Sequence, residues 1–259
     1  MQEKYLYIDS RNRLSGQFGN SYSVWLSDTV RGIKYVELVS ARIPNTIYNI
    51  PNGSNVFQIN SNPINLSEGF YSVSSLVNDL SLQSNLVSAG ISVSYLQSEG
   101  KFIISNTNGF NFQTRLGSVL GFPSNVIITS QVATFANAVY NSTFTGRHFV
   151  KSSNVIDLTT TDFVFLDIDQ LRDSSMLDST SNPGSGGNVR RTFGPIPLNV
   201  VSGGVKTFTE NTDFRLRVEF TPPITSIERL NLSWRDSSGN ILNFNGFEDN
   251  SVLLRFICL

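Results

Sequence analysis

The sequence predicts a mostly β protein, a single antiparallel jelly roll (β-sandwich) with a small α+β insertion. Charged residues make up only 15% of the 259 residues, well below the usual quarter, so Ser, Asn, Thr and Gly carry much of the polarity. Short segments with alternating apolar and polar residues recur along the chain, and one amphipathic helical segment interrupts them. This composition suits strands and tight turns better than surface helices, so an antiparallel β domain is expected.

The first 62 residues predict an arm followed by strands. Residues 1–19 hold few apolar side chains, so we expect an N-terminal arm that neighbouring subunits order. Tyr22, Val24 and Leu26 then alternate with polar residues, and a long strand-like run covers 33–43. Pro44 ends this run because proline withholds a ladder donor. The jelly roll is expected to comprise 20–62 and 125–259.

Residues 63–124 predict the α+β insertion. A helix is expected from the spacing of its apolar side chains, with Ser72 as the N-cap. Two strands at 91–95 and 102–104 should form a hairpin, and a short helical turn should end at Gly121. The expected core of the insertion is Val73, Leu76, Val77, Leu80, Val93, Tyr95, Phe102 and Ile104.

Beyond the insertion, strand candidates recur at the spacing of an all-β domain. They cover 163–168, 196–200, 205–208, 214–220, 227–234, 241–244 and 252–257. The Gly- and Ser-rich run at 179–188 predicts a flexible loop, since it holds too little apolar surface to order itself.

Several blocks of the sequence carry a family resemblance through their order. They are IDSRNR at 8–13, YSVWL at 22–26, VELVSARIPNTIYN at 36–49, EGFYS at 68–72, LGF at 120–122, and 230–247 with its Asp236-x-x-Gly239 turn. Together they resemble the penton and minor capsid jelly-roll proteins of large double-stranded DNA viruses and virophages. Asn12 stands where the family has Asp, the proline that usually opens the fourth block is missing, and the likeness is weakest at 131–158.

The resemblance implies a structural virion protein, a penton at the vertices of an icosahedral capsid, located in the capsid shell. It implies self-association as a homopentamer and contact with the major capsid protein and other minor capsid proteins. A minor capsid cement or linker protein is the alternative. A carbohydrate-binding jelly roll is a second alternative, with Tyr140, Phe144 and Phe149 as candidate aromatic contacts, although core packing explains them as well.

The sequence predicts no enzyme, with no catalytic residue, metal site or cofactor site. His148 is the single histidine, so a metal site or a Ser-His-Asp relay would depend on one residue. Asp162, Asp167 and Asp169 form the nearest approach to a carboxylate cluster, which we expect to face water. The run SNPGSGGN at 181–188 lacks the Lys and Ser/Thr of a phosphate-binding loop.

Charge and cysteine content limit the possible classes of partner and compartment. A net charge of −1 argues against nucleic-acid binding, which needs clustered positive charge. Arg11, Arg13, Arg190 and Arg191 are therefore predicted to contact carboxylates of neighbouring subunits. The single cysteine, Cys258, allows no internal disulfide, and no apolar run reaches the length of a membrane span or signal peptide. We expect assembly in a host cytoplasm.

Overall fold

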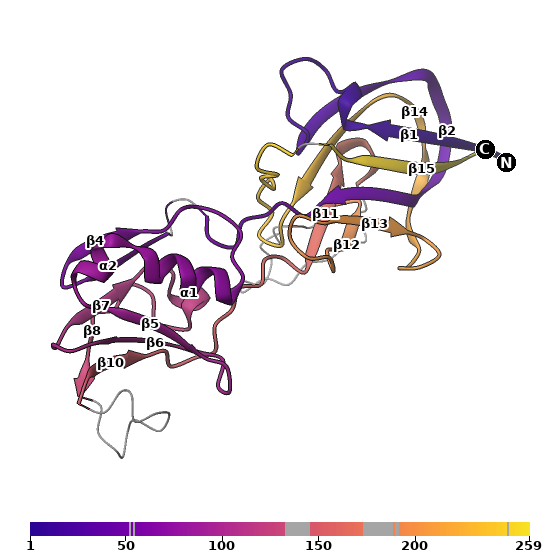
Figure 1. The fold of residues 1–259 in the computed structure, drawn as a ribbon. Helices are drawn as coiled ribbons and strands as arrows, with labels where there is room; N and C mark the ends of the chain where they lie inside the picture. The colour runs from indigo at the N-terminus through magenta and orange to yellow at the C-terminus, as the bar shows by residue number, and fades with distance from the viewer. Residues whose placement is uncertain (52, 54, 133–145, 173–188, 190–191, 248) are drawn as a thin grey trace. The chain divides into compact units, whose positions relative to one another are not determined.

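The computed structural model describes residues 1–51, 53, 55–132, 146–172, 189, 192–247 and 249–259. The chain divides into two compact units. The jelly-roll unit comprises Met1–Ile47 and Thr161–Leu259, and the insertion unit comprises Tyr48–Thr160. Strand pairings in both units are antiparallel (Figure 1), which confirms the mostly β prediction.

The jelly-roll unit is built on one seven-stranded sheet with the order β1-β15-β2-β14-β11-β12, with β13 also paired to β2. Its strands are β1 (Gln2–Asp9), β2 (Ser21–Pro44), β11 (Phe163–Ile168), β12 (Gly194–Pro197), β13 (Val205–Thr209), β14 (Leu216–Arg235) and β15 (Ser251–Cys258). Short 3-10 turns η1 (Ser10–Asn12) and η3 (Asp169–Leu171) follow β1 and β11.

This sheet curls around a single core. Ile8 of β1 and Ile196 of β12 belong to strands at opposite ends of the sheet order, yet both lie in one buried cluster with Trp234. Figure 1 shows the long strands β2 and β14 bending around this core. The long strands β2 and β14 allow the bend, since Gly32 adopts φ +62° within β2 and the register shifts between Glu219 and Ile224 in β14.

The insertion unit has a separate core between two four-stranded sheets and short helices. One sheet has the order β5-β6-β10-β9 and the other β4-β3-β7-β8. The strands are β3 (Val56–Ile59), β4 (Asn62–Asn65), β5 (Ser92–Leu96), β6 (Lys101–Asn106), β7 (Asn111–Thr114), β8 (Ile128–Thr129), β9 (Gln131–Val132) and β10 (His148–Lys151). The helices are α1 (Val73–Leu82), α2 (Ser84–Ser88) and α3 (Gly117–Leu120). No helix of the described part of the chain is both long and apolar enough to cross a membrane.

The predicted helix forms, but as two helices. Ser72 caps α1 through a capping box with Ser75, as its position predicted, and Leu76 and Leu80 are buried. The first helix ends at Leu82 with Gln83 as its C-cap, and Val87 on α2 is 60% exposed. Val73 lies outside the buried cluster, while the other predicted core residues belong to it or pack against it.

The units differ from the predicted boundaries at both ends. The insertion unit is wider than 63–124, because β3 pairs with β7 and β10 pairs with β6 across those limits. Residues 1–19 are not a detached arm. All eight residues of β1 pair with β15, and Ile8 is buried in the core, so β1 is an integral strand of the sheet.

Candidate functional site

The first candidate surface is the free edge of β1. This strand lies at one end of the sheet order, and among the described residues it pairs only with β15. Its side chains alternate, with Leu6 and Ile8 toward the core and Tyr5 and Tyr7 outward, 57% and 60% exposed. An edge strand with unpaired backbone groups and outward aromatic rings is suited to contact with another chain.

The opposite end of the sheet order is protected. The strand β12 holds Pro195 and Pro197, which have no N–H to offer to an added strand. No proline occurs in β1. Of these two terminal strands, β1 is therefore the one able to accept a further strand.

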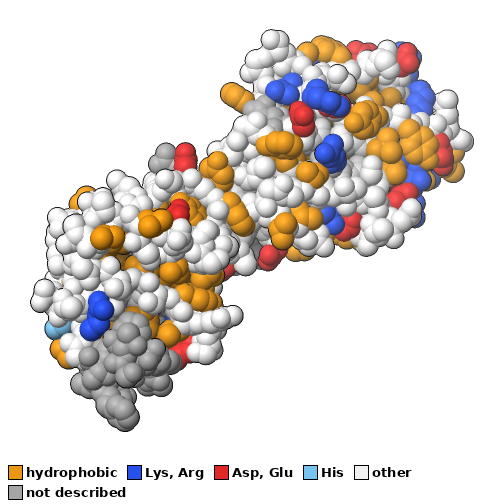
Figure 2. All heavy atoms as spheres, viewed as in Figure 1, with side chains coloured by type: hydrophobic (Ala, Val, Ile, Leu, Met, Phe, Trp, Pro, Cys, Tyr) orange, Lys and Arg blue, Asp and Glu red, His pale blue; other side chains and the backbone are white. Residues whose placement is uncertain are grey.

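Hydrophobic side chains lie among Lys and Arg over the jelly-roll unit on the face that Figure 2 shows. Several large apolar side chains of this unit are more than half exposed. They are Met1, Tyr5, Tyr7, Phe18, Trp25, Val201 and Leu259. Exposed aromatic side chains and Arg are enriched in protein interfaces, so this face of the unit is a candidate contact surface.

Two of the four predicted contact arginines lie in the turn after β1. Arg11 forms an ion pair with Asp9 at 2.5 Å, and its own side chain is 68% exposed. Its hydrogen bonds lower the pKa of Asp9 from the ordinary 3.8 to about 2. Arg13 donates Nε to the carbonyl of Gln17 at 2.7 Å and Nη1 to that of Ser10 at 2.9 Å. Arg11 therefore presents a guanidinium to the outside, whereas Arg13 braces its own turn.

The other predicted contacts are only partly described. Arg190, Arg191, Tyr140, Phe144 and the loop at 179–188 lie outside the described residues. Phe149, the third aromatic candidate for carbohydrate binding, lies in β10 and is partly buried. Of the three aromatic candidates, only Phe149 therefore lies within the described residues.

Of the three clustered carboxylates, Asp162 and Asp169 face water as expected, but Asp167 does not. Asp167 is 3% exposed and accepts from Arg172 at 3.0 Å and Arg235 at 2.8 Å. Burial raises the pKa of Asp167, but the two guanidiniums together outweigh burial and lower the pKa below its ordinary value. Asp169 is exposed and accepts from Arg172 at 2.8 Å. Of the two carboxylates, Asp167 is a structural ion-pair partner.

A second buried carboxylate was missed from the sequence. Glu37 of β2 has a side chain only 1% exposed. It accepts from Nε of Arg215 at 2.6 Å and Nε of Arg255 at 2.7 Å, and Arg255 also pairs with Glu210. The signal was a charged residue inside the apolar run VELV at 36–39, where burial requires a cationic partner.

His148 lies in β10, and its Nδ1 is buried without a hydrogen-bond partner in the described structure. Among the described residues, no three His, Cys, Asp or Glu side chains gather as a metal-binding group.

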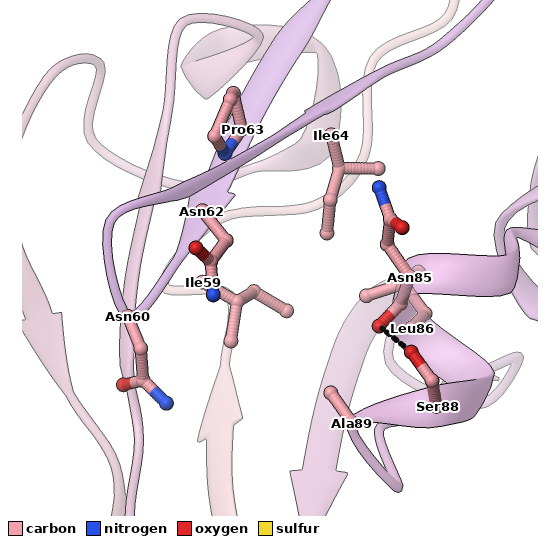
Figure 3. A pocket seen from close by; sticks show the side chains of 9 residues that line it. All are labelled: Ile59, Asn60, Asn62, Pro63, Ile64, Asn85, Leu86, Ser88 and Ala89. Carbon is pink, nitrogen blue, oxygen red and sulfur yellow. Dashed lines mark hydrogen bonds between the residues drawn. The ribbon is translucent and has the colours of Figure 1, made fainter.

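The insertion unit carries a hollow of about 370 Å³ between the β3–β4 hairpin and α2 (Figure 3). Amide side chains of Asn60, Asn62 and Asn85 line it together with the aliphatic Ile59, Ile64 and Leu86. Ser88 donates to the carbonyl of Asn85 at 3.2 Å along one wall. The lining residues carry no charged group or nucleophile pair, so nothing in the hollow indicates a reaction.

No protein-family model matches the chain. Among curated proteins, it is 29% identical over 97 residues to the penton capsid protein P1 of Paramecium bursaria Chlorella virus 1. The match covers 37% of this chain and 54% of the relative, so it spans about half of the relative's length.

Two solved structures align with nearly the whole chain. The mavirus penton protein has a TM-score of 0.49 and 11% identity, with all of both chains covered. A chain of the Sputnik virophage has a TM-score of 0.49 and 15% identity, with 99% of this chain and 98% of that one covered. The fold assignment rests on the sheets described above and not on these two structural similarities. In sequence, a curated homologue of this chain is a penton capsid protein of a large double-stranded DNA virus, which confirms the resemblance that the order of the sequence blocks indicates.

Proposed function

We propose that this chain is a structural capsid protein that occupies the vertices of an icosahedral virus shell. The observation that carries the proposal is the sequence similarity to a penton capsid protein, because a penton is the capsid unit at a vertex of the shell. The fold agrees with that role, since a jelly roll with an open strand edge is suited to lateral contact. On this basis its role is structural and not catalytic, with assembly into virions in the host cytoplasm.

The proposed assembly is a closed homopentamer. A free edge on β1 that contacts a different surface of the next copy gives a heterologous interface, and such an interface forms a ring when the rotation between copies closes. Tyr5 and Tyr7 would supply the apolar contacts, and Arg11 beside them a charged one. We expect about 800 Å² buried per partner. The remaining partners are the major capsid protein and other minor capsid proteins.

Native mass spectrometry of the full chain tests the ring directly. We expect a pentamer in the unmodified protein and monomer after Tyr7→Lys, because a charge at the edge opposes association. Val201→Lys places the same charge on a loop residue that is 82% exposed, and it should leave the pentamer intact. The proposal is contradicted if the unmodified chain stays monomeric at high concentration and forms no ring in particles.

Arg11 is proposed as the contact that fixes the register between copies, with Arg190 and Arg191 as further candidates. A guanidinium can hold Asp9 and still present N–H groups to a neighbouring carboxylate, since it has five donors. Arg11→Gln should weaken the pentamer about tenfold or more, whereas Arg31→Gln on exposed β2 surface should not. Equal pentamer dissociation constants for the two variants would remove Arg11 from the interface.

A further inference from the structure

A polar hollow of about 310 Å³ lies in the jelly-roll unit, between the start of β2, the end of β14 and η3. Its volume is at the lower end of the range for small-molecule sites. Gln17, Ser23, Asp169, Arg229 and Asn231 contribute to its walls.

The sheet register places the lining side chains on one face. Trp25 is paired with Arg229, and Ser23 with Asn231, in directly opposed positions of β2 and β14. Opposed residues share a face, and so do residues two apart on one strand. Since Val24 between them points into the core, Ser23 and Trp25 lie on the other face of the sheet. Arg229 joins the hollow to Trp25, because Arg229 lines the hollow and its guanidinium lies over the indole ring.

Arg229 holds unused hydrogen-bonding capacity. Its described hydrogen bond runs from Nη2 to Oγ of Ser23 at 2.8 Å, and no described carboxylate pairs with it. Its Cζ lies 5.7 Å from the ring centroid of Trp25, which is 62% exposed. A guanidinium has five N–H groups, so several remain for a ligand.

The neighbouring groups add donors and acceptors. Gln17 accepts the N–H of Ser23 at 2.6 Å through Oε1, which leaves its amide nitrogen without a described partner. Asp169 accepts from Arg172 at 2.8 Å and from Asn231 at 3.2 Å, and carboxylate oxygens can accept further bonds. A sugar hydroxyl both donates and accepts, so this combination suits a polyol.

Charge narrows the ligand class. Three guanidiniums, on Arg172, Arg229 and Arg235, stand against two carboxylates, on Asp167 and Asp169, and the carboxylate of Asp167 is already bonded to two of the three. Arg229 is thus the guanidinium without a carboxylate partner among the described residues. A guanidinium forms stronger hydrogen bonds with a carboxylate than with a neutral hydroxyl, so a ligand with a carboxylate is favoured.

From these contacts we propose that the hollow binds an acidic sugar, a glycan residue whose carboxylate pairs with Arg229. Its ring lies against the exposed indole of Trp25, and its hydroxyls bond Asp169, Asn231 and the amide of Gln17. A protein carboxylate or a free phosphate would pair with Arg229 but would leave the indole and the acceptor Asp169 unused. This site is independent of the proposed vertex role.

The test is a titration of the full chain with glucuronate and with glucose, monitored by ligand-observed NMR. The two sugars differ only at C5, where glucuronate has a carboxylate and glucose a hydroxymethyl group. N-acetylneuraminate and acetate extend the panel. We expect saturable binding of an acidic sugar, about tenfold tighter than glucose, from one charged hydrogen-bonded contact. Acetate should bind far more weakly, because it offers no ring to Trp25.

Variants locate the binding. Arg229→Gln should abolish the preference for the acidic sugar, and Trp25→Ala should weaken both sugars, with Trp25→Phe restoring most of the affinity. Arg31→Gln, an exposed arginine on the same strand as Trp25, is the matched control and should change neither. No saturable sugar binding, acetate binding as tight as glucuronate, or an Arg229→Gln variant that keeps its preference would each overturn the proposal.

Discussion

At the scale of single residues, buried carboxylates are held by arginines from other strands. Glu37 lies between Arg215 and Arg255, and Asp167 lies between Arg172 and Arg235. A buried charge is tolerated only when such partners compensate for its lost hydration. The arginine content that first indicated subunit contacts is thus used in part within the chain.

Replacing Glu37 tests the value of its network. Glu37→Gln leaves two guanidiniums without their carboxylate, and we expect it to cost about 1 to 3 kcal/mol in the free energy of unfolding. Glu219→Gln is the matched control, because Glu219 also pairs with an arginine but is 63% exposed. Its cost should stay within about 0.5 kcal/mol. Urea unfolding compares the two, and equal costs would show that the network adds no stability.

The Asp9–Arg11 pair predicts a dependence of stability on pH. The folded pKa of Asp9, about 2, lies below its ordinary value of 3.8. The pair therefore stabilises the fold fully above pH 3.8, and that contribution is lost as the pH falls through 2. Thermal unfolding between pH 5 and 2 should show a smaller loss of Tm for Asp9→Asn than for the unmodified chain. Parallel curves would exclude this role.

At the scale of elements, the most reliable sequence signals were period and capping. Ser72, the hairpin at 91–104 and the turn at Gly121 formed as expected. A side chain at Gly121 would lie 2.2 Å from the carbonyl oxygen of Asn154, so glycine is required there for space as well as for conformation.

Long-range pairing was the part that the sequence could not supply. The strands expected at 22–26 and 33–43 are one strand, β2, because both halves pair with β14 and continue through Gly32. The segment 241–244 forms only an isolated bridge at Ile241. Neither polarity nor hydrophobic period shows that β1 pairs with residues 251–258 at the other end of the chain, so the polar N-terminal segment resembled an arm. For the candidate site, the composition indicated that arginines form subunit contacts. It did not show which arginines form ion pairs within the chain instead.

The integral position of β1 gives a prediction opposite to that for a detached arm. Ile8→Ala should cost about 2 to 5 kcal/mol in the free energy of unfolding, because Ile8 is 2% exposed within the core. Gln2→Ala, on the exposed part of the same strand, should be close to neutral. Denaturant unfolding measures both. If Ile8→Ala is as stable as Gln2→Ala, β1 does not contribute to the core and behaves as a peripheral arm.

At the scale of the whole molecule, each unit holds its own buried cluster. Leu76→Ala should therefore destabilise the insertion unit by about 2 to 5 kcal/mol and leave the jelly-roll unit's transition unchanged. Val87→Ala, at a 60% exposed position of the same unit, is the control. Hydrogen exchange resolves the units separately. Equal loss of protection in both would show that they unfold as one cooperative body.

The way the chain enters and leaves the insertion unit has a consequence for evolution. Asn49 donates to the carbonyl of Leu158 at 3.1 Å, which fastens the two ends of that unit together. On the jelly-roll side, Asn45 bonds the carbonyl of Val200 at 2.7 Å and the N–H of Leu198 bonds the carbonyl of Asp162 at 2.7 Å. The two chain segments that flank the insertion unit are thus both hydrogen-bonded to residues 198–200 of the jelly-roll unit. We therefore expect a short Gly-Ser bridge in place of residues 48–160 to leave the jelly roll able to fold. If it does, evolution can replace this unit while it keeps the same jelly-roll framework.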